Sequence, residues 1–186
     1  MPTPRINKVF PHNTYFLTLT VIEWIDIFTK PQYFHVLARS MQFCQKERGL
    51  QVFAYVFMTN HLHFIACSEE VSLSDVVRDF KRHTTKEIKE LLREDENRRY
   101  IKTLLANTYS LKKGSEFQIW QRENFAEMIQ SEEMMKTKID YIHHNPVRKE
   151  YVREPQDWKY SSARFYEIDG YKSEEEDIVV PCTTWN

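Results

Sequence analysis

The chain has 186 residues, of which 41% are hydrophobic and 28% are charged, and its formal net charge is −1. These values are typical of a globular protein with one well-filled core. The N-terminus lacks a positive-then-apolar signal pattern and no stretch approaches the roughly 20 apolar residues that a membrane span needs, so we expect a cytoplasmic protein and no membrane partner.

The small net charge hides an uneven distribution. Residues 167–177 hold six acids and one lysine, a net of −5, which leaves +4 on the rest of the chain. We expect one domain at residues 1–166 and an acidic, loosely held tail at residues 167–186. The three cysteines have no CxxC spacing and are odd in number, which fits reduced thiols.

The first half of the chain predicts a β-α-β order. Thr14 to Ile22 alternates apolar residues with threonines, which indicates a strand with one buried face. Pro31 is a favourable first residue for a helix, and Gly49 a favourable end. The expected elements are a strand at 14–22, a helix from Pro31 to Gly49, and two strands at 51–58 and 61–66 joined through Thr59-Asn60 as a hairpin or one bent pair. A second helix starts at Ser72 or Ser74.

The second half is less regular. The second helix could continue through Leu104, and short apolar segments at 117–120 and 126–129 indicate an edge strand and the approach to it. Ser131, followed by two glutamates, begins a helix that ends near Asn145-Pro146. Strands with two crossing helices on one face predict an α+β sandwich.

Two histidines flank one apolar residue in the sequence His61-Leu62-His63. Side chains alternate along a strand, so both imidazoles should project side by side from one face. Such a pair can bind a divalent metal ion. The alternative is a pair of hydrogen-bonded strand histidines without a ligand, because a His-x-His tripeptide also arises by chance.

Tyr141 precedes Asn145 by four residues, so the two share one face of the predicted helix. If that helix packs over the histidine strand, a phenol, an amide oxygen and two imidazole nitrogens converge. The alternative is a core aromatic and a helix C-cap, since Pro146 disfavours helical geometry at Asn145. His143 and His144 adjoin the tyrosine, but three ligands suffice for a metal ion, so neither is assigned a role.

Five segments resemble, in order and over most of the chain, the single-tyrosine HUH transposases of the IS200-like kind, and within them the REP-associated tyrosine transposase group. The matching segments are Phe57–Phe64, Val76–Lys86, Ile119–Asn124, Asp140–Val147 and Asp157–Ala163. The acidic tail and the stretch from Glu94 to Lys113 look less typical of that family.

The resemblance implies a ferredoxin-like antiparallel sheet with helices on one face and the histidine pair on a central strand. It also implies that His61 and His63 are metal ligands, that Tyr141 is the nucleophile and that Asn145 is the third ligand. The implied activity is DNA transposition by a metal-dependent endonuclease and strand transferase. It acts on hairpin-containing single-stranded DNA through a covalent 5′-phosphotyrosine. A bacterial, nucleoid-associated protein is implied, as a monomer or homodimer.

A site of two imidazoles and one amide oxygen should accept Mg²⁺ or Mn²⁺, and Mn²⁺ tolerates nitrogen ligands better. For DNA binding we expect phosphate contacts from Lys81, Arg82 and Lys86, which lie in the second helix, and from Arg148. A run of charges is also what a solvated helix face looks like, especially from Lys89 to Lys102.

Two other functions stay open at this point. In a metal hydrolase, a metal-bound water would attack, and Tyr141→Phe would leave most of the cleavage intact. In a nucleic-acid-binding regulator with vestigial nuclease activity, no covalent adduct would form with any single-stranded DNA. Trp120 and Trp158 could stack on unpaired bases, although a tryptophan more often packs in the core.

Overall fold

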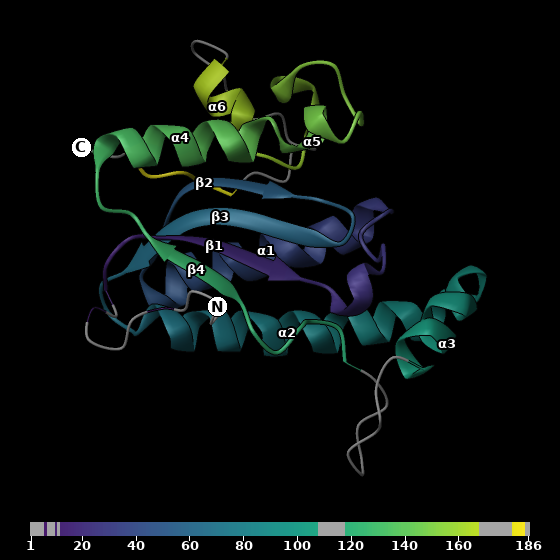
Figure 1. Cartoon of the computed structure of the whole chain (residues 1–186). Helices are drawn as coiled ribbons and strands as arrows, with labels where there is room; N and C mark the ends of the chain where they lie inside the picture. Colours follow the sequence, from purple (N-terminus) through teal and green to yellow (C-terminus); the bar gives the residue numbers. More distant parts are fainter. Residues whose placement is uncertain (1–5, 7–9, 11, 108–117, 168–179, 185–186) are drawn as a thin grey trace.

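The computed structural model describes residues 6, 10, 12–107, 118–167 and 180–184. Its strands and helices follow one another in the order β-α-β-β-α-α-β, with further helices after the last strand (Figure 1). The strands are β1 (Tyr15–Thr20), β2 (Leu50–Phe57), β3 (His61–Ser68) and β4 (Phe125–Met128). The helices are α1 (Pro31–Arg48), α2 (Leu73–Glu94), α3 (Arg99–Asn107), α4 (Glu132–His143), α5 (Asn145–Arg148) and α6 (Ala163–Glu167), with short 3-10 turns at Ile22–Trp24, Glu96–Arg98 and Pro155–Asp157.

The four strands form one antiparallel sheet in the order β2-β3-β1-β4. β3 is therefore a central strand, as expected for the histidine pair. Thr18 and Thr20 of β1 lie opposite His63 and His61 in the register. The two histidines are thus flanked by paired strands on both sides.

Alternation along the strands gives the sheet two different faces. One face, with Leu17, Leu62 and Phe64, packs against α1 and α2 in the main core. The other face, with Phe16 and Ile65, packs against α4 in a smaller core. Figure 1 shows α4 on the side of the sheet opposite α1 and α2. The α+β sheet with two helices packed on one face is as predicted; α4 is an additional helix that covers the second face.

Helix ends follow the sequence signals. Pro31 is the first residue of α1, and Gly49 ends it with a φ of 63°, in the left-handed region where glycine is unstrained. The Ser131 side chain accepts a hydrogen bond from the Met134 amide at the start of α4. The second long helix does not continue through Leu104: it stops at Glu94, and the buried Arg98 instead bonds the carbonyls of Asp26 and Ile27.

The division into a domain and a tail stays a prediction, since residues 168–179 lie outside the described part of the chain. Of the tail residues that are described, Val180 is buried in the main core, and the Thr183 amide donates to the Val52 carbonyl at 2.7 Å. Among the described helices, none combines the length and the apolar character needed to cross a membrane.

Candidate active site

The two histidines of β3 lie next to each other on the face that α4 covers. Their ring centroids are 4.8 Å apart, and the residues are only 5% and 6% exposed. The Nδ1–H of His61 donates to Asn60 Oδ1 at 2.7 Å, an orientation fixed because the Asn60 amide nitrogen donates to Asp26 and to the Trp24 carbonyl. His63 Nδ1 shares a 2.8 Å hydrogen bond with Thr18. Nε2 is thus the ring nitrogen left to each histidine for a ligand.

Burial keeps both rings neutral at physiological pH. It lowers the pKa of His61 to about 4, helped by Lys149 and opposed by Asp26 and Asn145. Burial also lowers the pKa of His63 to about 3, with smaller contributions from the neighbouring His61, Arg148 and Lys138. A neutral imidazole is the form that binds a metal ion.

Tyr141 lies over this pair from the last turn of α4. Its ring centroid is 5.3 Å from that of His63 and 5.8 Å from that of Phe16, both in edge-on geometry. The Tyr141 side chain remains accessible, since the residue is 40% exposed. It is therefore not the buried core aromatic that the alternative interpretation required.

Asn145 is the first residue of α5, and the cap of α4 is His144, so Asn145 is not a helix C-cap. It is buried, and its Oδ1 has no hydrogen-bond partner. The Asn145 side chain comes close enough to His61 for a weak polar interaction, short of hydrogen-bond geometry, that raises the pKa of the imidazole, so the two are neighbours. A buried amide oxygen without a partner costs free energy, and a cation beside it would remove that cost.

The donor set fits a divalent ion only when the amide is included. Among the described residues, no three His, Cys, Asp or Glu side chains are grouped closely enough to hold a metal ion. Two imidazole nitrogens and one amide oxygen, from His61, His63 and Asn145, are compatible with Mn²⁺ or Mg²⁺.

Cations surround the tyrosine. The Arg148 guanidinium lies over the Tyr141 ring, 4.5 Å from its centroid, and donates to the Tyr141 carbonyl. Lys138, one helical turn before Tyr141, lies 4.7 Å above the Phe16 ring and pairs with Glu127. Arg148 was predicted to bind DNA; Lys138 and Lys149 were not singled out. Lys138 precedes Tyr141 by three residues on one helix, a spacing that places the two side chains near each other and could have indicated Lys138 as a cation of the site.

The other three residues predicted to bind DNA lie elsewhere. Lys81, Arg82 and Lys86 are on α2, which packs on the opposite face of the sheet. The Lys81 ammonium donates to the Gln121 carbonyl and, at 2.9 Å, to Asn124, while Arg82 pairs with Asp79. The structure does not bring this trio together with the histidines and Tyr141, and its DNA contacts stay a prediction.

The neighbouring histidines and the two tryptophans have other surroundings. His143 is buried and shares a 2.9 Å hydrogen bond with Ser162, and His144 is paired with Asp140. Trp120 is buried, with its indole nitrogen bonded to Thr84, and that of Trp158 is bonded to the Phe57 carbonyl. Both indoles are thus held by bonds within the described fold.

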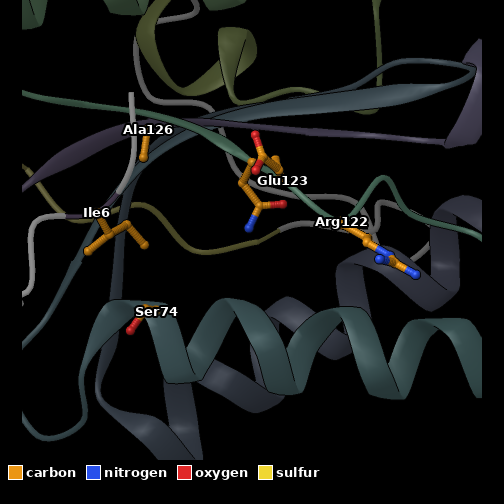
Figure 2. A pocket seen from close by; sticks show the side chains of 6 residues that line it. Ile6, Ser74, Arg122, Glu123 and Ala126 are labelled. Atoms are coloured by element: carbon orange, nitrogen blue, oxygen red, sulfur yellow. The ribbon is translucent and has the colours of Figure 1, made fainter. Parts of the chain in front are cut away.

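Two cavities lie beside the candidate active site and not in it. A pocket of about 370 Å³ near the start of α2 is shown in Figure 2, with Ser74 on the helix and Arg122 and Glu123 on the segment before β4. A second, of about 750 Å³, lies between α4 and α6 and is lined by His143, Tyr166 and Cys182 among others. Neither cavity is lined by His61, His63, Tyr141 or Asn145, and the exposed Tyr141 side chain leaves the candidate site open to solvent on one side.

Comparisons with known proteins agree on one family. The family model described as "Transposase IS200 like" matches residues 13–118, more than half of the chain. A protein of Haemophilus influenzae, provisionally named as a REP-associated tyrosine transposase, is 41% identical over 44 residues, which span 24% of this chain and 25% of that protein.

A solved structure has a similar fold over its whole length. It is described as a REP-associated tyrosine transposase bound to a REP hairpin, and it matches with a TM-score of 0.63 at 19% identity, covering 100% of both chains. This likeness supports the ferredoxin-like architecture expected from the sequence.

Proposed function

Because this chain belongs to the IS200-like transposase family, we propose that it cuts and rejoins single-stranded DNA through a covalent bond to Tyr141. The observation that carries the proposal is the place of the Tyr141 ring, 5.3 Å from His63 on the face where two neutral imidazoles and a buried amide oxygen meet. A transposase role follows from the family. The nucleophile, the metal ion and the DNA substrate are our proposal.

In the proposed step, the Tyr141 hydroxyl oxygen attacks the phosphorus of a DNA phosphodiester. The bond from oxygen to phosphorus forms and the bond from phosphorus to the 3′ oxygen breaks. The phenolic proton passes to solvent, and the released 3′ oxygen takes a proton from solvent. The 5′-phosphotyrosine conserves the energy of the broken bond, so attack by another 3′-hydroxyl rejoins the strand without ATP.

The residues around Tyr141 have defined parts in this step. The Arg148 guanidinium packs on the phenol ring and can donate to the phosphate, and Lys138 adds positive charge near His63. His61, His63 and Asn145 would hold a divalent ion. When bound, Mg²⁺ or Mn²⁺ would supply Lewis-acid polarisation of the phosphate oxygens and orient the scissile group.

We propose hairpin-containing single-stranded DNA as the substrate. The solved structure of similar fold is described as bound to a REP hairpin, and the cations near Tyr141 would supply phosphate contacts on this chain. Either a monomer or a homodimer is compatible with this substrate.

The test uses an end-labelled hairpin with single-stranded flanks, the wild-type protein and Mn²⁺, analysed on a denaturing gel. We expect a nicked product and a protein–DNA adduct, both absent in Tyr141→Phe, while DNA binding is retained because only a hydroxyl is removed. Tyr100→Phe, an exposed tyrosine on α3, serves as the matched control and should behave as wild type.

Two results would contradict the proposal and each favours a different alternative. Cleavage that persists in Tyr141→Phe without an adduct would indicate attack by water, as in a metal hydrolase. Tight DNA binding by the wild type with neither cleavage nor adduct on any single-stranded hairpin would indicate a regulator.

A further inference from the structure

Trp24 is an exposed tryptophan beside the candidate active site. Of the three tryptophans that the structure describes, Trp120 and Trp158 bond through their indole nitrogens inside the fold, while Trp24 is 56% exposed. An indole is a large apolar surface, and leaving it in water forgoes the free energy of burial. This exposure leaves the face of the indole accessible to a ligand.

The indole is held next to one of the proposed metal ligands. The ring centroids of Trp24 and His61 are 5.5 Å apart, with the planes at 69°. Asn60 connects the two residues, because its amide nitrogen donates to the Trp24 carbonyl at 3.1 Å while its Oδ1 accepts from His61. The position of the indole is thus coupled to the turn that positions His61.

The backbone that presents Trp24 is strained. Glu23 and Trp24 have φ values of 51° and 56°, two successive left-handed residues with side chains where glycine would be unstrained. Hydrogen bonds from the Trp24 and Ile25 amides to the Val21 and Ile22 carbonyls hold the turn. Strained segments that are held by hydrogen bonds cluster at functional sites, where the strain is tolerated because it positions a side chain for binding.

The charges around the loop indicate which part of a nucleotide it would meet. The loop carries Glu23 and Asp26, which disfavour a phosphate. The cations that act on the histidine pair come from elsewhere: Lys138 is on α4, Arg148 ends α5 and Lys149 follows it. The uncharged part of a nucleotide next to the scissile phosphate is its base. A flat aromatic face binds any base by stacking, with little preference for sequence.

We propose that Trp24 is a stacking platform for an unpaired base of the DNA strand next to the phosphate that is cut. The inference rests on the proposed function for the identity of its ligand. Stacking here would hold the neighbouring phosphodiester against His61 and Tyr141, and it would require that base to be single-stranded, since a paired base has no free face to offer.

Binding is measured without metal ion, by the fluorescence polarisation of a labelled oligothymidylate and of an abasic strand of the same length. Trp24→Ala should weaken oligothymidylate binding by about 5- to 150-fold, the range for losing one stacked base. Trp24→Phe should keep most of the affinity. The matched control is Phe43→Ala, because Phe43 is 58% exposed on α1, on the other face of the sheet, and should leave binding unchanged.

Two further readouts separate stacking from a general loss of structure. The slope of log K against log salt should be the same in Trp24→Ala and wild type, because no charge is removed. The abasic strand should bind wild type and Trp24→Ala equally. Equal affinity of wild type and Trp24→Ala for oligothymidylate overturns the inference, as does an equal loss on both strands.

The failure of this inference is distinguishable from failure of the proposed function. If wild type binds neither strand, the inference and the single-stranded substrate are overturned together. If Trp24→Ala binds oligothymidylate as wild type does, only the inference is overturned, since no cleavage or Tyr141 chemistry enters the measurement.

Discussion

At the level of single residues, the buried side-chain oxygen of Asn145 supports a metal-binding role for the neighbouring pair of histidines. Without a hydrogen-bond partner, that oxygen costs about 1–3 kcal/mol of stability. A protein that only needed a core would fill this place with an apolar side chain. The cost is consistent with an amide retained as a ligand.

Replacing Asn145 by an apolar residue of similar size should therefore separate stability from metal binding. Asn145→Leu should leave the free energy of unfolding of the metal-free protein unchanged or raise it by up to about 2 kcal/mol, because the unpartnered oxygen is removed. The same variant should bind Mn²⁺ more weakly. Urea denaturation without metal and titration calorimetry with Mn²⁺ measure the two effects, and a large loss of stability with intact Mn²⁺ binding would show that the amide is structural.

The double variant His61→Ala, His63→Ala should lose Mn²⁺ binding and DNA cleavage while the chain still folds. Calorimetry of Mn²⁺ binding checks the first and the denaturing gel the second. His83→Ala, on α2 with a hydrogen bond to Ser40, is the matched histidine control and should bind Mn²⁺ normally. Undiminished Mn²⁺ affinity in the double variant would remove the two histidines from the site.

Spacing in the sequence was enough to pair these residues two by two, but not to bring the two pairs together. The period of two in a strand put His61 and His63 on one face, and four residues in a helix put Tyr141 near Asn145. Trp24 could not be found in this way, because it lies in an irregular turn with no periodicity, and its exposure depends on a backbone conformation that no local pattern signals.

At the level of elements, strands and helices with clear end signals were predictable and their placement was not. Alternation in β1, and Pro31 and Gly49 around α1, fix local structure. Periodicity also shows which side of α4 is apolar, but it does not show which face of the sheet receives it. Composition and pattern therefore left the face undetermined, and the structure shows α4 on the histidine face.

The place of α4 and α5 changes which cations should bind DNA near the cut. Arg148→Gln with Lys149→Gln should lower the slope of log K against log salt by about 1.4 units, near 0.7 for each phosphate of single-stranded DNA that is no longer neutralised. Lys81→Ala should instead act through stability, because its ammonium bonds Gln121 and Asn124 and joins α2 to the segment before β4.

Fluorescence polarisation of a labelled hairpin over a series of salt concentrations measures these slopes. A variant of all three α2 cations, Lys81, Arg82 and Lys86, measured beside it tests the sequence-based prediction directly. A larger change in slope from the α2 variant than from the Arg148, Lys149 variant would place the phosphates on the face of the sheet away from Tyr141.

For the molecule as a whole, buried neutral histidines make stability depend on pH. Burial lowers the pKa of His61 and His143 to about 4 and that of His63 to about 3. As the pH falls, the unfolded chain binds these protons near pH 6.5, whereas the folded chain binds them only near the lowered pKa values. The contribution of the neutral histidines to the free energy of unfolding is therefore complete above about pH 6.5 and falls as the pH drops toward 4.

His143→Gln should reduce this dependence, because glutamine does not titrate and can still bond Ser162. Between pH 7 and pH 5 the loss of unfolding free energy should be smaller in the variant by about 2 kcal/mol, near 1.4 kcal/mol per pH unit below 6.5. Urea denaturation of both proteins at the two pH values measures the difference. An identical loss in both would mean that His143 is not kept neutral by the fold.

The central claim is that Tyr141 becomes covalently attached to DNA, and peptide mass spectrometry tests it most directly. After reaction with a single-stranded hairpin and Mn²⁺, nuclease trimming and trypsin digestion yield the peptide Ile139–Arg148, whose only tyrosine is Tyr141. We predict that this peptide carries the mass of an attached nucleotide phosphate, and that Tyr141→Phe yields no adduct. A nucleotide on the neighbouring peptide Glu150–Arg153, which contains Tyr151, or on any other peptide would contradict the account.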